Sequence, residues 1–254
     1  HLPPRQTSRW DGGTSVYELA EDFWLTVGGK AAIFRFRQDT NDWNSINSCL
    51  GENDEYHLRG VSPKVALDIG GYLGSVGIPI AIDHPEAQVL IVEPVPWNAE
   101  LIRVNAALNR VAERVTVFEG AVGPPGVTTS EIRFGYRGDS NLEHHAFVGN
   151  TSLAYDTGGD VEHDAIQVET LGIAALLDRF KIAPDWTKID CEGAEWAFFD
   201  APPEDRARLP FIIGEVHPVR GHVMTDLVDL LDGHTVTLDG PPAGPCAFKA
   251  VLND

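Results

Sequence analysis

From residue 64 to the carboxyl end, short apolar runs alternate with longer runs in which apolar residues recur every three or four positions. The short runs predict strands and the longer runs predict amphipathic helices. The expected strands cover residues 65–69, 88–92, 115–118, 165–169, 186–190, 211–215, 235–238 and 247–252. The expected helices cover residues 73–81, 97–111, 173–180 and 223–231, with another starting near residue 192. Such alternation is typical of a mostly parallel sheet covered by helices.

The front of the chain follows a different pattern. Residues 1–12 mix prolines and glycines with polar residues, which predicts a flexible lead-in. Apolar residues at helical spacing predict a helix over residues 16–27, ended by two glycines. Strict alternation then predicts a strand over residues 31–37, and a second short helix is expected over residues 43–50.

A long polar segment interrupts the alternation at residues 123–165. It contains a cluster of glycines and prolines, an expected strand at residues 131–136, and a polar stretch with two histidines. Long loops inside compact domains are usually functional, so we expect this insertion to contact substrate or to act as a lid. The patterns together predict a lid or flanking section over residues 1–62 and one main domain over residues 63–254.

Composition and charge restrict the partners more than the fold. The 254 residues include 38 acidic and 19 basic ones, and the net charge of -19 argues against binding nucleic-acid phosphates. No run of 18 apolar residues occurs, and the first residues lack the order of a signal peptide, so we expect a cytoplasmic protein with no membrane partner. Cys49, Cys191 and Cys246 form no C-x-x-C pair and are expected to be buried, reduced thiols. None of these features indicates an oligomeric state.

The turn after the strand at residues 65–69 is the most informative single stretch. Asp68, Gly70 and Gly74 form the pattern D-x-G-x-x-x-G, whereas a dinucleotide-binding turn would need glycine in place of Tyr72. An acid at this place would repel a pyrophosphate, but it suits the positively charged amino-acid end of S-adenosylmethionine. The alternative is a strand-to-helix turn that needs glycine only for its backbone geometry.

The next two strand ends also carry acids. Glu93 ends the second strand, and a carboxylate there can accept both hydroxyls of an adenosine ribose. Glu119 ends the third strand, and the small residues Gly120 and Ala121 after it would leave room for a flat adenine ring. Glu93 alone could be an exposed strand-end acid. Three successive strands that end in an acid favour a ribosyl-adenine ligand.

Two further carboxylates follow the strand at residues 186–190. Asp190 and Glu192 converge on the open end of the sheet, where we expect Asp190 to face the sulfonium or the methyl acceptor. Glu195 lies in the first turn of the next helix, where an acid is favoured electrostatically. A magnesium site could form from Asp190, Glu192 and His217, but the spacing does not demand one, and no metal is predicted.

A histidine lies at the end of the following strand. His217 comes two residues after Glu215, across the same crevice, and is the natural group to take a proton from an acceptor hydroxyl. Two histidines of the long polar segment are rivals for this role, His144 and His145.

These motifs resemble those of the FkbM-type S-adenosylmethionine-dependent methyltransferases, from about residue 31 to the carboxyl end. The matching stretches are D-I-G-G-Y-L-G at residues 68–74, E-P-V-P-W-N at 93–98, K-I-D-C-E-G-A-E at 188–195 and E-V-H at 215–217, together with Asn105 and Asn109. The first stretch departs from the family, whose loop usually reads G-A-N-x-G. Gly71 and Tyr72 here replace the Ala-Asn pair.

The resemblance implies a Rossmann-like, doubly wound α/β fold with a seven-stranded, mostly parallel sheet whose last strand is antiparallel. It implies S-adenosylmethionine as cofactor and a small-molecule methyl acceptor. We expect in-line O-methylation of a sugar or natural-product hydroxyl, with His217 as base beside Asp190 and Glu192. The residues expected to hold the cofactor are Asp68, Gly70, Tyr72, Leu73, Gly74, Glu93, Pro94, Asn98, Glu119, Gly120, Ala121, Ser140 and Asp190. The residues expected to hold the acceptor are Asn141, His144, His145 and Glu215.

Three other functions stay open at this level. N-methyl transfer would use the same groups, because oxygen and nitrogen acceptors both need a deprotonating group near the sulfonium. A nicotinamide oxidoreductase would use the same sheet, but it needs the glycine that Tyr72 displaces. A noncatalytic cofactor-binding protein would keep the loop without the chemistry.

Overall fold

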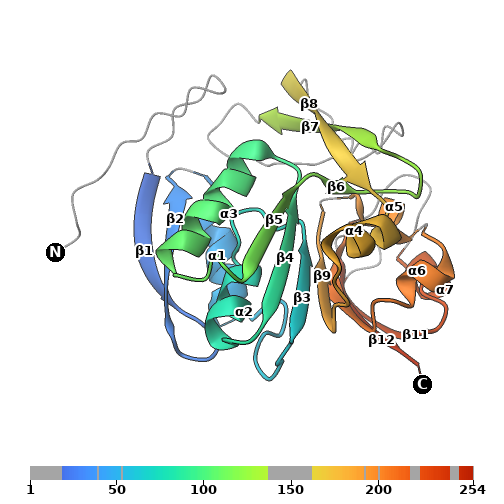
Figure 1. Ribbon diagram of the computed structural model, residues 1–254, viewed down its shortest axis with the longest axis horizontal. Coiled ribbons are helices and arrows are strands. Elements are labelled where there is room, and N and C mark those ends of the chain that lie inside the picture. The colour runs from blue at the N-terminus through green and yellow to red at the C-terminus, as the bar shows by residue number, and fades with distance from the viewer. Residues whose placement is uncertain are drawn as a thin grey trace.

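Seven strands form the central sheet of the protein, which we describe from a computed structural model (Figure 1). The structure describes residues 19–38, 40–52, 54–136, 162–191, 193–199, 201–217, 224–240 and 246–253. The seven strands are β3 (Val65–Ile69), β4 (Gln88–Glu93), β5 (Val115–Glu119), β9 (Trp186–Ile189), β10 (Phe211–Val216), β11 (His234–Asp239) and β12 (Cys246–Leu252). Their order across the sheet is β11-β12-β10-β9-β3-β4-β5, and β12 alone runs in the opposite direction to the other six strands. The expected Rossmann-like, doubly wound sheet with an antiparallel last strand is confirmed.

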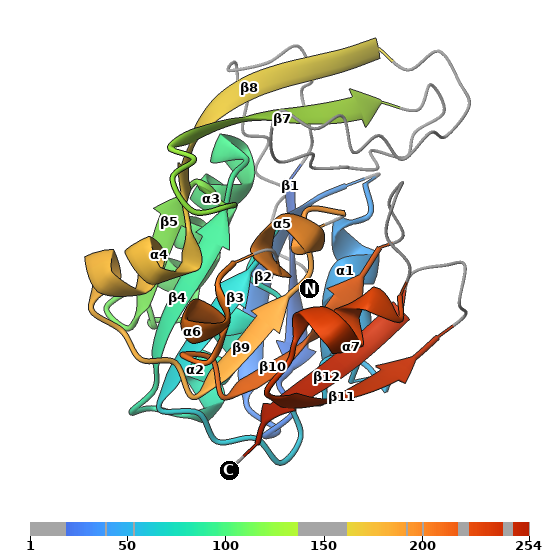
Figure 2. The ribbon, with the colours of Figure 1, turned by 90° about the vertical axis from the view of Figure 1, so that its right-hand side faces the viewer.

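Helices cover both faces of this sheet. They are α1 (Asp42–Leu50), α2 (Gly77–Asp83), α3 (Pro96–Leu108), α4 (Ile173–Phe180), α5 (Glu195–Phe199), α6 (Pro203–Arg206) and α7 (Asp226–Leu230). The first three lie on one face and the other four on the opposite face (Figures 1 and 2). α2 begins at Gly77 and not at residue 73, so Pro79 lies in the first turn, where a missing N–H removes no helical hydrogen bond. In the described part of the chain, no helix is both long and apolar enough to cross a membrane.

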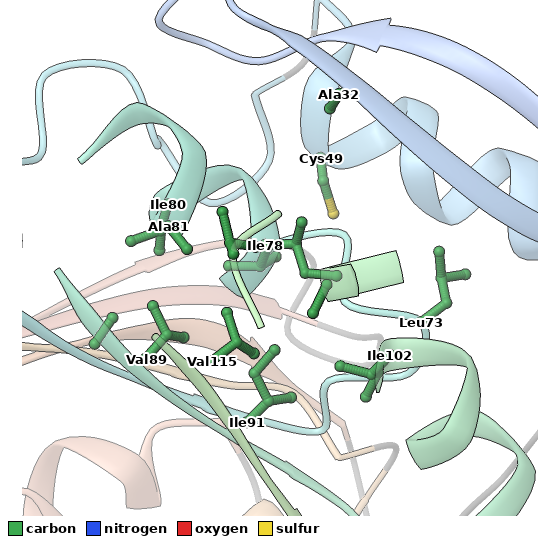
Figure 3. Close-up of a cluster of buried hydrophobic side chains, with 14 of the residues drawn as sticks. Ala32, Cys49, Leu73, Ile78, Ile80, Ala81, Val89, Ile91, Ile102 and Val115 are labelled. Carbon is green, nitrogen blue, oxygen red and sulfur yellow. The ribbon is translucent and has the colours of Figure 1, made fainter. Parts of the chain in front are cut away.

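The glycine turn after β3 rests on an aliphatic core (Figure 3). Ile78 of α2, Ile91 of β4 and Ile102 of α3 are fully buried in this core. A Cβ atom on Gly71 would lie 2.1 Å from Ile91 Cγ2, and one on Gly74 would lie 2.5 Å from Ile78 Cδ1. Packing therefore requires both glycines, whatever else the turn does.

The first described segment is a hairpin and not a helix. β1 (Leu19–Leu25) pairs antiparallel with β2 (Ala31–Arg37), so the helix expected over residues 16–27 is wrong where the structure describes it. Phe23 and Leu25 are exposed, and a turn with Gly29 at φ +77° joins the strands. The apolar residues of this 7-residue segment fit a helical and an alternating pattern almost equally. Hydrogen bonding to β2 makes the segment a strand.

Two asparagine side chains hold β2 in place. Asn105 lies in α3, and Asn109 directly follows this helix. The Asn105 side chain accepts from the Arg35 N–H at 2.8 Å and donates to the Arg35 carbonyl at 3.1 Å. Asn109 does the same with Ile33, at 2.8 and 2.7 Å. The two amides thus act as an extra strand along β2, which is the structural reason for a paired-asparagine motif.

The insertion forms a separate small sheet with the order β6-β8-β7, from β6 (Ala121–Val122), β7 (Thr129–Tyr136) and β8 (Glu162–Leu171). β7 and β8 lie beyond the carboxyl ends of the central strands (Figure 2). Ile132 of β7 and Val168 of β8 pack in one apolar cluster with Ala194, which precedes α5. The hairpin is therefore anchored beside the edge where ligands bind in such sheets.

Candidate active site

The turn after β3 and the segment after β9 touch each other at the point where the strand order reverses. β3 lies between β4 and β9, and ligands bind at such switch points in doubly wound sheets. Gly70 has φ +79°, and a Cβ atom there would lie 1.8 Å from the Asp190 carbonyl oxygen. The structure thus brings together two stretches that the sequence predicted for one site.

A buried lysine connects them. Lys188 of β9 places Nζ 3.4 Å from Asp68 Oδ1 and 3.9 Å from Asp190 Oδ2, and it donates to the Gly70 carbonyl at 2.6 Å. Burial opposes its charge, but the two carboxylates raise the pKa of Lys188 above its ordinary value. The Tyr56 hydroxyl donates to Asp190 Oδ2 at 2.7 Å, and burial together with Asp190 raises the pKa of Tyr56, so this tyrosine stays a donor. The sequence analysis missed Lys188 and Tyr56, although the first belongs to the K-I-D stretch.

Asp68 lies beneath the site and not on its surface. Its side chain is fully buried, with Oδ2 accepting the Gly77 N–H at 3.0 Å and Oδ1 facing Lys188. In this structure the carboxylate fixes the start of α2 and the lysine. Its expected contact with the charged end of a ligand stays a prediction.

Glu93, at the end of β4, holds the glycine turn. Its Oε2 accepts the Tyr72 N–H at 2.8 Å, while Oε1 accepts the Val95 N–H at 3.0 Å and the Asn98 amide at 3.3 Å. Burial raises the pKa of Glu93 to about 7, against the opposing effect of these donors. A carboxylate has about four acceptor positions, so the three donors leave one of them unfilled.

Tyr72 joins the glycine turn to the front section. Its hydroxyl donates to Asp42 Oδ1 at 2.5 Å, at the start of α1. Arg37 of β2 binds both oxygens of Asp42, at 2.8 and 2.9 Å, donates to Asn98 Oδ1 at 2.8 Å, and lies 5.3 Å from the centre of the Tyr72 ring. Tyr72, which replaces the asparagine usual in the family's loop, therefore has a structural role in this network. Its contributors from the front section, Arg37 and Asp42, were not found from the sequence.

The side chains of Glu195 and His217 converge beside Asp190. Ligand atoms of Asp190, Glu195 and His217 all lie within 4.8 Å of one another. His217 Nδ1 lies 3.3 Å from Glu195 Oε1, and His217 Nε2 lies 3.9 Å from Glu215 Oε2. Burial and Asp190 raise the pKa of Glu215. The set can accept a proton at an imidazole flanked by carboxylates, and it could also hold a divalent cation. The sequence analysis assigned Glu195 only to the helix start.

The third strand end is packed closely against the protein. Glu119 is exposed and accepts from Arg103 at 3.1 Å. A Cβ atom on Gly120 would lie 2.4 Å from the Phe118 ring and 2.7 Å from the Glu169 carbonyl oxygen. The space on the Cβ side of Gly120 is therefore occupied by the protein, and the adenine contact expected at this strand end stays a prediction. Ala121 is buried in β6.

The remaining predicted residues fall into three groups. Leu73 is fully buried in the aliphatic core, and Gly74 adopts φ +89°. Pro94 is partly exposed beside Glu93. Five predicted site residues lie outside the part of the chain that the structure describes: Ser140, Asn141, His144, His145 and Glu192.

Comparison with known proteins gives the family. The model of the Methyltransferase FkbM domain matches residues 68–233, a span that contains Glu93, Asp190 and His217. No curated protein sequence matches the chain.

Solved structures of methyltransferases are also similar. One is a precorrin-6y C5,15-methyltransferase from Geobacter metallireducens GS-15, with 18% identity and a TM-score of 0.43, over 77% of this chain and 84% of that one. Another is an O-methyltransferase from Bacillus cereus in complex with SAH, with 16% identity and a TM-score of 0.38, over 83% of this chain and 91% of that one. The assignment rests on the family match, which covers more than half of the sequence. The chain belongs to the FkbM methyltransferase family and is an S-adenosylmethionine-dependent methyltransferase.

Proposed function

We propose that the enzyme methylates a hydroxyl oxygen of a small molecule, either a sugar or a natural-product intermediate. The observation that carries this proposal is the placement of His217 beside Asp190 and Glu195, next to the glycine turn. An imidazole in this position can take the proton that an alcohol loses when it is methylated. The net charge of -19 supports a small-molecule acceptor over nucleic acid.

The residues fit the cofactor at two points. Glu93 keeps an acceptor position for a ribose hydroxyl at the end of β4. Asp190 Oδ1 is buried and has no hydrogen-bond partner among the described residues, so it calls for a donor such as the ammonium group of S-adenosylmethionine. We assign Glu93 and Asp190 to direct contact, and Asp68 and Lys188 to support from beneath.

The bound cofactor would supply a methyl group on a positively charged sulfur, which keeps the bonding electron pair when the methyl group leaves. The protein then has two tasks. Glu215 orients the acceptor, and His217 takes the hydroxyl proton as the oxygen bonds to the methyl carbon. Holding the two reactants in line supplies much of the acceleration. The proposal gives no role to a metal. The three free thiols support a reducing, cytoplasmic location.

Mass spectrometry with deuterium-labelled S-adenosylmethionine tests this function. A panel of hydroxylated sugars and polyketide-like alcohols should acquire the label on oxygen. A matched panel in which amines replace the hydroxyls should not. Label on the amines alone would establish N-methyl transfer instead. Tight binding of S-adenosylhomocysteine with no labelled product from either panel would contradict the proposal.

A further inference from the structure

His217 is held from one short helix at two places. The Trp196 indole N–H donates to the His217 carbonyl at 2.7 Å, and the preceding residue, Glu195, lies 3.3 Å from Nδ1 of the His217 ring. Both residues belong to α5 and are buried, with Glu195 fully so. α5 therefore fixes the backbone and the ring of His217 together.

The carboxylate of Glu195 is itself fixed as an acceptor. Oε1 accepts the Cys191 N–H at 2.6 Å, and Oε2 accepts the Gly193 N–H at 3.0 Å. Backbone N–H groups can only donate, and two oxygens that both accept favour the ionised carboxylate. A carboxylate next to an imidazole nitrogen requires the proton on that nitrogen, so the bonded form of His217 has its proton on Nδ1.

We propose that Glu195 is a positioning residue for His217, an inference that rests on the proposed function. It keeps the ring proton on Nδ1, so that Nε2 is the nitrogen that takes the acceptor proton. The hydroxyl oxygen gives its proton to Nε2 while its electron pair forms the bond to the methyl carbon. The ring becomes an imidazolium with a proton on each nitrogen, and Glu195 stabilises that charge. Among the residues that the structure describes, Asp190 after β9 and Glu215 on β10 are further carboxylates that face the ring.

The same three side chains could instead ligate a divalent cation, since their ligand atoms lie within 4.8 Å of one another. The hydrogen bonds favour the paired arrangement, because both oxygens of Glu195 already accept backbone N–H groups. The distinction can be measured directly.

The first test needs no acceptor. In the full chain with ¹⁵N-labelled histidine, the His217 signals can be assigned by their loss in His217→Asn. They should show protonated Nδ1 and unprotonated Nε2 in the neutral ring. Glu195→Gln should shift them toward the opposite tautomer, whereas Glu204→Gln, at an exposed position of α6, should not. The same tautomer in the wild type and in Glu195→Gln would overturn the inference. So would strong broadening of these signals by micromolar Mn²⁺, which would assign the cluster to a cation.

The second test uses an acceptor from the labelled panel. Glu195→Gln should lower kcat about 100-fold, while the KM for the acceptor and the Kd for S-adenosylhomocysteine change by less than about threefold. Its rate should keep rising at high pH where the wild type is level, because the acceptor must then lose its proton to water. A pH profile of unchanged shape would mean that Glu195 only supports the fold. If His217→Asn is as active as Glu204→Gln, His217 is not the base, and the proposed function is contradicted. The tautomer measurement would still show whether Glu195 is paired with Nδ1 of His217.

Discussion

At the scale of single residues, Glu93 is buried and accepts three hydrogen bonds, and its charge is therefore sensitive to pH near neutrality. Burial raises the pKa of Glu93 to about 7, so the side chain is neutral below that pH and charged above it. The charged form is the better acceptor for ribose hydroxyls. Raising the pH from about 6 to about 8 should therefore lower the Kd for S-adenosylhomocysteine up to about tenfold by calorimetry.

Replacing this carboxylate should remove the pH effect. Glu93→Gln should raise the Kd by roughly 10- to 100-fold and leave it nearly constant with pH, because a charged acceptor is lost. Glu119→Gln, at the exposed end of the neighbouring β5, is the matched control and should keep the wild-type pH dependence. A wild-type Kd that does not change with pH would refute the assigned role of Glu93.

Tyr72 provides a second residue-level prediction. Its hydroxyl donates to Asp42, which Arg37 also binds, in a buried network. Tyr72→Phe should lower the free energy of unfolding by about 1.5–3 kcal/mol, the usual contribution of a hydrogen bond to a charged group. A double-mutant cycle with Asp42→Asn in urea denaturation should show coupling of about 1 kcal/mol. Strict additivity would mean that the bond contributes nothing.

The sequence predicted the position of the site in the sheet better than the roles of its individual residues. Asp190, Glu215 and His217 lie at the carboxyl ends of two adjacent parallel strands, β9 and β10, so their meeting is a direct consequence of sheet geometry. Asp68 lies one residue before the end of β3, whose bounds were predicted correctly, but its side chain is fully buried. The sequence pattern does not show which strand-end acids are covered by packing and which face the ligand edge. The role of Glu195 depends on how α5 packs on β10, which no local pattern encodes.

At the scale of elements, the clamp of α3 on β2 can be tested. Asn109→Ala removes the amide that bonds both backbone groups of Ile33, and the unfolding free energy should fall by about 1–3 kcal/mol. Amide hydrogen exchange over residues 31–37 should become faster. Asn44→Ala removes an amide that donates to Asn41 at the surface and should change stability by less than about 0.5 kcal/mol. Unchanged exchange in β2 would contradict the clamp.

Element identities follow from the sequence where the run is long or the partner is near in the chain. α3 has one clear apolar face, and the strands of the central sheet are bounded by turns. β1 was mistaken for a helix because its few apolar residues satisfy both periods. Its strand state depends on pairing with β2, and β2 in turn depends on α3, a contact distant in the chain.

At the scale of the whole molecule, Lys188 joins the two halves of the sheet at the switch point between β3 and β9. Lys188→Met would leave Asp68 and Asp190 without their shared cation, and the unfolding free energy should fall by about 3–5 kcal/mol. Adding Asp68→Asn should restore part of this loss, because one uncompensated buried charge is removed. Lys249→Met on β12, a position away from the buried carboxylates, is the control in chemical denaturation. A loss no larger than in this control would contradict the proposed role of Lys188.

A mostly parallel sheet was predictable from the regular alternation of strands and helices. The link between the front section and the glycine turn was not, because it needs Arg37, Asp42 and Tyr72 to meet across the fold. Such buried polar networks depend on the three-dimensional arrangement of distant segments.

The central claim is that the carboxyl edge of β4 and β9 holds the methyl donor against His217. A crystal structure with bound S-adenosylhomocysteine tests it most directly. We predict that a ribose hydroxyl donates to Glu93, that the amino group donates to Asp190, and that the sulfur faces His217. A ligand that contacts neither Glu93 nor Asp190 would contradict the account.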